Sequence, residues 1–114
     1  MAKVVGVLYA GAVNVPLSIK LGETNDLVFR VKHSDSKYII TSKFQLAKIR
    51  AILPECPLVE KVIIFDEVPD KKDNELYISE IIEMGDKFLA EHEDMFIQRY
   101  KSIDPDDYAN ISYT

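Results

Sequence analysis

The side chains most often used in catalysis are sparse in this sequence and form no recognisable set. There are two histidines, His33 and His92, and a single cysteine, Cys56. Neither histidine has a Cys, Asp or Glu at metal-ligand spacing beyond the run EHED, in which Glu91 and Asp94 flank His92. On a helix these two carboxylates could share a face, but an acidic surface turn explains them equally well. We therefore predict no metal site.

Glycine-rich signatures that hold phosphate or expose a nucleophile are also missing. The sequence contains no G-x-G-x-x-G, no G-x-S-x-G and no G-x-x-x-x-G-K, and it has only four glycines. Cys56 lies between two prolines and has no C-x-x-C partner, so we interpret it as a buried apolar side chain. A lone cysteine cannot form an internal disulfide, which fits a reducing, cytoplasmic location.

Asp66 is the one residue whose position resembles that of a reactive group. It follows the apolar run KVIIF at 61–65, where receiver-type signalling domains carry their phospho-accepting aspartate. Such domains also need an acidic pair after the first strand and a lysine after the last, and neither is present. We interpret Asp66 as a turn-forming residue at the end of a strand. A free-standing α/β binding or receiver-like signalling module remains the alternative.

Composition indicates an ordinary globular segment. The chain has 114 residues, 47% hydrophobic and 29% charged, with a formal net charge of −5. The acidic balance disfavours nucleic-acid binding, which requires clustered cations. The apolar start of the chain, up to residue 17, is shorter than the roughly 20 residues that span a bilayer.

The elements around these residues alternate between short β-branched runs and segments of helical period. Strands are predicted at the following ranges: 13–17, 38–41, 61–65 and 109–114. A helix is expected from about residue 23 to residue 33. Ser42 and Gln45 match a capping box, which places the start of a further helix at Ser42 and its end before Pro54.

The second half is predicted to hold one long amphipathic helix or two. Residues 67–75 are polar and predicted to form a surface loop. Apolar residues then recur at helical spacing from Ile78 to Tyr100, with Ser79 as a candidate cap and a break expected at 92–94. The whole pattern predicts an α/β fold, residues 1–114 forming a single segment with a mainly parallel sheet flanked by helices.

Two end motifs resemble the adenylate-forming superfamily, which includes acyl-CoA synthetases, luciferases and peptide-synthetase adenylation domains. The segment DPDDYANISYT at 104–114 is similar to the strand that leads into this family's phosphate loop, Ser-Gly-Thr-Thr-Gly followed by Pro-Lys-Gly. LYAGAVNVPLS at 8–18 resembles an earlier structural motif of the family. Between them, HSDSKYIITS at 33–42, PLVEKVIIFDE at 57–67 and EMG at 83–85 follow the order found in long-chain fatty acid CoA ligases.

This resemblance implies a parent enzyme that uses ATP and magnesium to convert a fatty acid to an acyl-adenylate and then transfers the acyl group to coenzyme A. The chain would be a structural piece of its large N-terminal domain, in a parent that is cytoplasmic or attached to a membrane surface. No catalytic residue is assigned. Only Thr114 would belong to the nucleotide site, as the first residue of a phosphate loop cut short. We expect the piece alone to be inactive and to self-associate through exposed apolar groups or an unpaired strand.

Overall fold

The computed structural model describes residues 10–18 and 24–113, which fall into two parts. One part is Leu17–Glu83; the other combines Met1–Pro16 with Met84–Thr114. The elements, in chain order, are α2 (Thr24–His33), β1 (Tyr38–Thr41), α3 (Leu46–Ile52), β2 (Lys61–Ile64), β3 (Glu75–Tyr77), α4 (Ile78–Glu91) and α5 (Glu93–Lys101). Short 3₁₀ turns, Lys43–Gln45 and Leu53–Glu55, lie on either side of α3.

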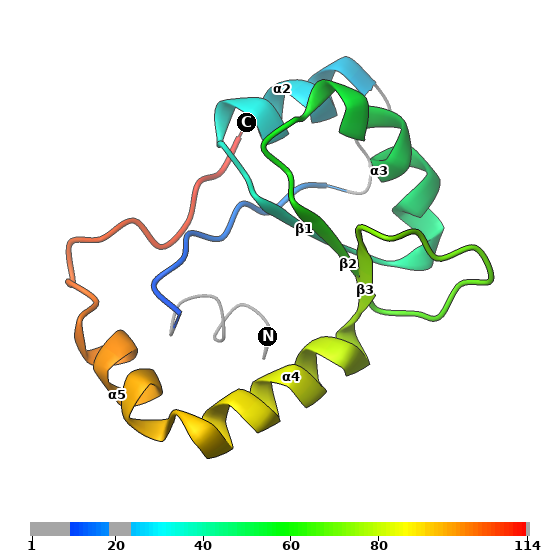
Figure 1. Ribbon diagram of the computed structural model, residues 1–114. Helices are drawn as coiled ribbons and strands as arrows, with labels where there is room; N and C mark the ends of the chain where they lie inside the picture. The colour runs from blue at the N-terminus through cyan, green and yellow to red at the C-terminus, as the bar shows by residue number, and fades with distance from the viewer. Residues whose placement is uncertain (1–9, 19–23, 114) are drawn as a thin grey trace. The chain divides into compact units, whose positions relative to one another are not determined.

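The part Leu17–Glu83 is built on a three-stranded sheet of order β1-β2-β3 (Figure 1). Both strand pairs are parallel, with Ile39 opposite Val62 and Ile64 opposite Tyr77. The expected mainly parallel α/β fold is therefore confirmed. The strand prediction at 38–41 is confirmed in full, and the one at 61–65 is correct up to Ile64.

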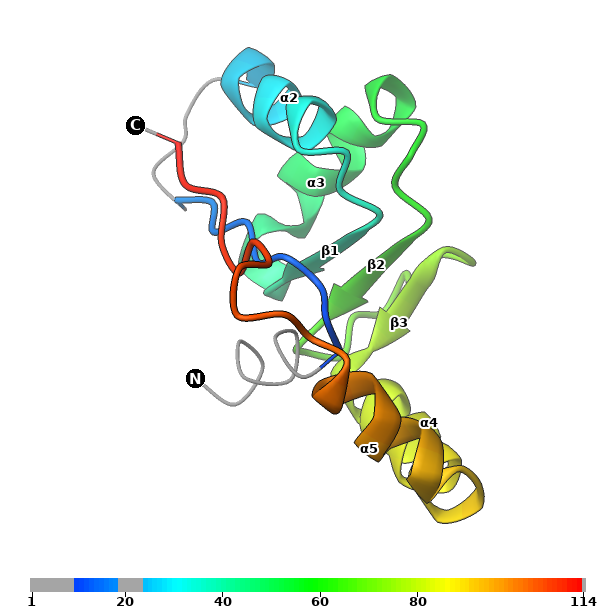
Figure 2. The same cartoon turned by 90° about the vertical axis from the view of Figure 1, so that its left-hand side faces the viewer.

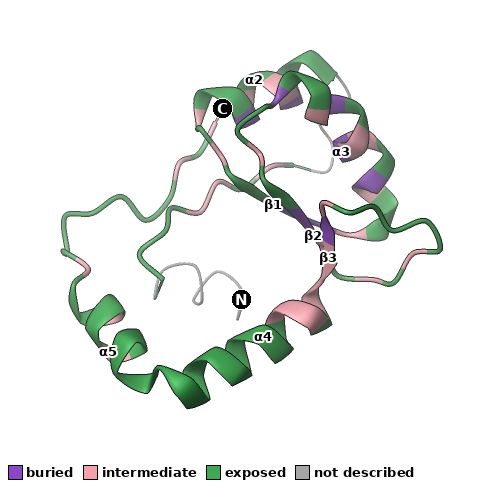
Figure 3. Ribbon diagram, viewed as in Figure 1, coloured by how far each residue is buried: buried purple, intermediate pink, exposed green. Residues whose placement is uncertain are grey.

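One face of this sheet carries the core. Ile39, Val62 and Ile64 are buried on the same face, because side chains alternate along a strand and the register pairs these positions. Two helices, α2 and α3, cover that face (Figure 2). The stretches of ribbon coloured as buried accordingly lie on these two helices and on the strands (Figure 3). The helical residues of this core are Leu27, Val31, Leu46, Ile49 and Ile52.

Helix α2 confirms the helix predicted from about residue 23, with residues 19–23 lying outside the described chain. Asp26 lies in its first turn and basic residues lie in its last turn, as the helix dipole favours. The helix ends where Asp35 adopts a left-handed backbone conformation, with φ of 53°. Aspartate tolerates this conformation better than most residues, and the turn leads directly into β1.

The predicted capping box is wrong. Ser42 precedes the 3₁₀ turn and makes no side-chain capping bond, and α3 begins only at Leu46. The first N–H of the turn, that of Lys43, instead donates to Asp66 Oδ2 at 3.2 Å. A carboxylate from the end of β2 thus takes the capping role that local sequence assigned to Ser42. The helix does end before Pro54, which lies in the following 3₁₀ turn.

Three further expectations are corrected. The predicted loop 67–75 ends in a strand, β3, which begins at Glu75. The predicted strands 13–17 and 109–114 are reduced, among the described residues, to one isolated parallel bridge between Asn14 and Asn110. Pro16 lacks the N–H that a longer pairing would need, and Thr114 lies outside the described residues.

Helices α4 and α5 confirm the expected break. The N–H of His92 closes α4 on the carbonyl of Phe88 at 2.8 Å, and His92 is also the N-cap residue of α5. The start of α4 differs from the prediction, because the helix begins at Ile78 and Ser79 is already inside its first turn. Glu80 Oε2 instead accepts the N–H of Tyr77 at 3.4 Å.

Candidate functional site

Thr114, the one residue assigned to a nucleotide site, lies outside the described residues. The chain that leads to it is described, and Asn14 pairs with it. The N–H of Asn14 donates to the carbonyl of Ala109 at 2.9 Å, and the N–H of Ile111 donates to the carbonyl of Asn14 at 2.9 Å. This is the pattern of a parallel bridge centred on Asn110.

The side chains at this bridge add two further hydrogen bonds. Asn14 Nδ2 donates to Asn110 Oδ1 at 3.0 Å. Asn110 Nδ2 then donates to Ser112 Oγ at 2.7 Å. A continuous chain of side-chain hydrogen bonds therefore runs from Asn14 along the strand towards residue 113.

A second polar cluster joins α3 to β3. Arg50 Nε donates to Glu75 Oε2 at 2.8 Å, and its Nη2 donates to Glu75 Oε1 at 2.7 Å, a two-point contact. Arg50 Nη1 also binds Asp70 Oδ2 at 2.6 Å, on the loop between β2 and β3. The Glu75 side chain has 0% relative exposure, since it lies on the core face of the edge strand opposite Val62. The cluster thus pins the edge strand and its loop to the covering helix.

The pairing changes the ionisation of all three groups. Hydrogen bonding to Arg50 lowers the pKa of Glu75 below its ordinary value, and the N–H of Lys72 adds to this effect. Arg50 lowers the pKa of Asp70 in the same way. The carboxylates in turn raise the pKa of Arg50. All three groups are therefore charged and paired at neutral pH, which leaves none of them as a proton donor or acceptor for a substrate.

Cys56 is buried, as the sequence predicted, with 3% relative exposure. It borders a shallow hollow of about 170 Å³, which is also lined by Lys32, Asp35 and Leu58. Burial raises the pKa of the Cys56 thiol, with a smaller opposing effect from Lys32. A thiol with a raised pKa is a poor nucleophile at neutral pH, so the hollow offers no reactive group.

Each of the two histidines packs against an aromatic ring. His33 stacks on Phe29 with ring centroids 5.3 Å apart, and His92 lies 4.7 Å from the ring of Phe88. Within the described residues there is no cluster of three or more potential metal ligands. The described residues also contain no buried side-chain nitrogen or oxygen without a hydrogen-bond partner.

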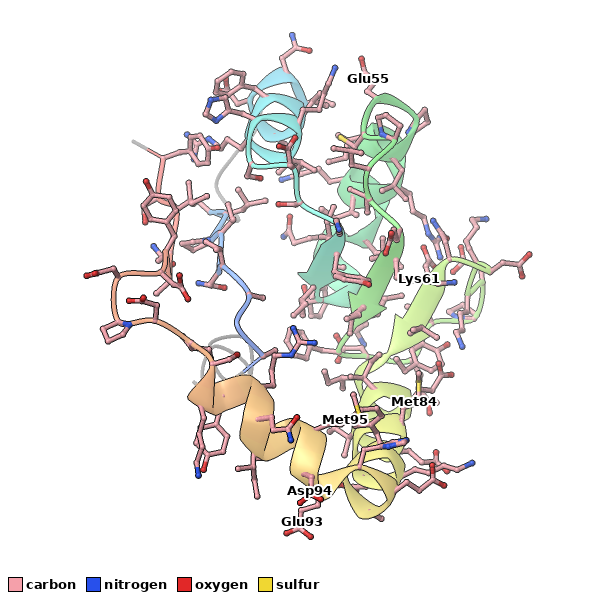
Figure 4. All side chains as sticks on the ribbon, turned by 60° about the vertical axis from the view of Figure 1, so that its left-hand side comes forward. Glu55, Lys61, Met84, Glu93, Asp94 and Met95 are labelled. Atoms are coloured by element: carbon pink, nitrogen blue, oxygen red, sulfur yellow. The ribbon has the colours of Figure 1, made fainter. Side chains whose placement is uncertain are left out.

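Helices α4 and α5 expose much of their apolar stripe. Figure 4 shows Met84 on α4 and Met95 on α5, and these side chains are 59% and 51% exposed. Figure 4 also shows Glu93 and Asp94 at the start of α5. The other large apolar residues exposed on these two helices are Ile82, Phe88, Leu89 and Phe96.

The described residues form a parallel α/β segment with two polar clusters, one around Asn14 and one around Arg50. Residues 1–114 match the AMP-binding enzyme family over their whole length. The chain belongs to the AMP-binding enzyme family. Membership of this family argues against the alternative of a receiver-like signalling module. Asp66, the residue that suggested this alternative, accepts the first N–H of a 3₁₀ turn.

Two solved structures resemble the chain over nearly all of its length. One is coronafacic acid ligase from Pectobacterium brasiliense, with 28% identity and a TM-score of 0.68 over 98% of this chain. The other is a single-site mutant form of that ligase, with 29% identity and a TM-score of 0.69 over 99% of this chain. The match covers 20% of each of those chains, so the present chain spans about one fifth of their length. Comparison with curated protein sequences gave no match.

A membrane-spanning helix is not found among the described residues, since no helix there is both long and apolar enough. The prediction from sequence missed the residues that turn out to organise the polar clusters, namely Asn14, Arg50 and Glu75. Their partners lie 96 positions away for Asn14 and 25 positions away for the ion pair, so no local pattern marks them. The one available signal was the resemblance of the two end motifs to a single family, which places both Asn14 and Asn110 inside them.

Proposed function

We propose that the chain is a structural segment of an ATP-dependent acyl-CoA ligase. In this proposal the parent enzyme joins a carboxylic acid to AMP, releases pyrophosphate and passes the acyl group to coenzyme A. The segment contributes part of the large N-terminal domain and ends on the strand that leads into the phosphate loop. Thr114 is the only residue proposed to touch nucleotide.

The observation that carries the proposal is the family match over all 114 residues. The bridge between Asn14 and Asn110 supports it, because it joins the two motifs that resemble the family's structural motif and its phosphate-loop strand. Adenylation suits an acid substrate, since a free carboxylate is a poor electrophile until it gains a leaving group. In this proposal magnesium, coenzyme A and, apart from the contact with Thr114, ATP bind to the remainder of the parent enzyme.

For the acid we propose a long-chain fatty acid. The support is that the internal motifs HSDSKYIITS, PLVEKVIIFDE and EMG occur in the same order as in long-chain fatty acid CoA ligases. The solved relatives carry the name of a different acid, coronafacic acid. That name favours a second candidate, a ligase for coronafacic acid or an acid like it. A panel of fatty acids of graded length, with coronafacic acid beside them, separates the two candidates for the parent enzyme.

The test of the segment's role is acid-dependent exchange between ATP and pyrophosphate. The 114-residue chain should show no exchange and form no thioester, because the phosphate loop and magnesium ligands are absent from the proposed segment. The longer parent chain should show both. Exchange by the pure 114-residue chain that is abolished by a substitution within it would contradict a purely structural role.

A further inference from the structure

We propose that Asn14 is a positioning residue for the nucleotide site, acting through the strand at 110–113. This inference rests on the proposed function, in which the phosphate loop follows that strand. Asn14 would not touch substrate. Its role is to fix where the strand lies, and therefore where the loop begins.

The contacts of Asn14 set both the position and the register of the strand. Its backbone N–H and carbonyl bind Ala109 and Ile111, each at 2.9 Å, on either side of Asn110. A slip of one residue would turn every side chain of the strand to the opposite face. The side-chain bond from Asn14 Nδ2 to Asn110 Oδ1, 3.0 Å, is compatible only with the observed register.

The Asn110 amide makes a second contact on its other side, where Nδ2 donates to Ser112 Oγ at 2.7 Å. In this arrangement Asn14 donates to Asn110 and Asn110 accepts. A serine hydroxyl can donate as well as accept, so the same three side chains also satisfy one another when both amides are turned over. The test must therefore remove the polar side chain of Asn14 altogether.

The backbone pairing at this bridge is short. Among the described residues it is an isolated pair outside the named strands, so no neighbouring ladder bonds reinforce it. Asn110 itself is exposed, as is Ser112. Removing the side-chain bond should therefore loosen this strand more than it would loosen a strand inside the sheet β1-β2-β3.

The experiment compares Asn14→Ala with Ser112→Ala in the longer ligase that carries this segment. Asn14→Ala removes the side-chain bond to Asn110 and keeps both backbone bonds, whereas Ser112→Ala removes only the second contact of Asn110. We expect Asn14→Ala to raise the KM for ATP about two- to tenfold, the effect of losing one net hydrogen bond. Ser112→Ala, the control, should stay within about twofold of wild type.

A merely structural role would lower thermal stability and reduce kcat, with no selective change in the KM for any one substrate. The inference requires instead that the KM for ATP rises while the KM for the acid and for coenzyme A stays constant. Asn14→Leu, which also keeps both backbone bonds and has no polar side-chain atom, serves as a second variant if Asn14→Ala does not fold, and the same rise in KM for ATP is expected. Amide exchange of Ile111 should also be faster in both Asn14 variants.

The outcomes separate the two proposals. A wild-type parent without ATP/pyrophosphate exchange would overturn the proposed function and, with it, the role of Asn14. A wild-type parent with exchange whose Asn14 variants keep an unchanged KM for ATP would overturn the role of Asn14 alone. Equal rises in KM for all three substrates would also refute it.

Discussion

The ion pair between Arg50 and Glu75 gives the sharpest stability prediction. The substitution Arg50→Met removes both hydrogen bonds to Glu75 and leaves this carboxylate at 0% relative exposure without its cation. Asp70, which is 62% exposed, can turn to water and contributes little to the cost. The destabilisation should therefore come almost entirely from Glu75.

The magnitude follows from the burial of Glu75. Removing one partner of a buried ion pair typically costs about 3–5 kcal/mol. We expect the lower end, about 3 kcal/mol, because the N–H of Lys72 still donates to Glu75 at 3.0 Å. The free energy of unfolding of a domain of this size is about 5–15 kcal/mol, so the loss is a large fraction of the total stability. It should lower the melting temperature by more than about 10 °C.

The assay is urea unfolding followed by circular dichroism between pH 3 and pH 7. In the wild type, the pKa of Glu75 lies below its ordinary value of 4.5. Its contribution is therefore present above the unfolded pKa and is lost as the pH falls through the lower, folded pKa. In Arg50→Met, burial without a cation should raise the pKa of Glu75, so the penalty disappears on protonation. The difference between the two proteins should begin to shrink above pH 4.5, as the pH falls through the raised pKa of Glu75 in Arg50→Met. It should shrink further below pH 4.5, as the wild type loses its own contribution.

Two further variants test the reasoning. Replacing both partners, Arg50→Met with Glu75→Leu, should recover most of the loss, because no buried charge remains. Lys71→Met is the matched control, since Lys71 and Glu80 form a partly exposed pair at 2.6 Å that should contribute little. A loss below about 1 kcal/mol in Arg50→Met, or a double variant no better than the single one, would refute the argument.

Three other predictions concern local features. Asp66→Ala should destabilise the chain by about 0.5–1 kcal/mol through loss of the cap on Lys43, while Ser42→Ala should be nearly neutral; chemical unfolding of both variants measures this. Cys56 should react with an alkylating reagent at least about tenfold more slowly in the native chain than in urea, by mass spectrometry, because burial raises its pKa. The chain should self-associate as its concentration rises, by sedimentation, and Ile111→Lys should weaken association if the 109–114 segment carries it; a strict monomer would contradict this.

The parts of the fold that could be predicted from sequence are those with a local apolar period. Strands β1 and β2 are short β-branched runs between polar residues, and α2 has apolar residues at helical spacing with acidic residues before it. The break at His92 was also visible, because three polar residues interrupt the apolar stripe. In each case the residues that decide the structure are neighbours in the sequence.

The parts that could not be predicted depend on distant partners. Strand β3 has three residues and begins with Glu75, a residue type that rarely lies in a core. Glu75 is buried there only because Arg50, 25 positions earlier, neutralises it. The predicted capping box is also replaced by other contacts. Asp66, 23 positions after Lys43, accepts the N–H of Lys43, and the N–H of Gln45 donates to the backbone carbonyl of Ser42 and not to its side chain. Tertiary contacts can override a local sequence preference, and the spacing of residues in the sequence does not reveal these contacts.

The pairing of Asn14 with the segment at 110–113 was also not predictable from local sequence, and its contacts support the proposed positioning role. The segment at 110–113 begins with the exposed polar residue Asn110 and has a single described bridge, so its own sequence pattern does little to predict where it lies. Asn14 supplies three hydrogen bonds to it from 96 positions away. A loop that continues such a strand inherits the strand's position, so any displacement at Asn14 would be passed to the first residues of the loop. The family motif around Asn14 therefore has a physical reason to accompany the phosphate-loop strand, although it contains no group that could react with ATP.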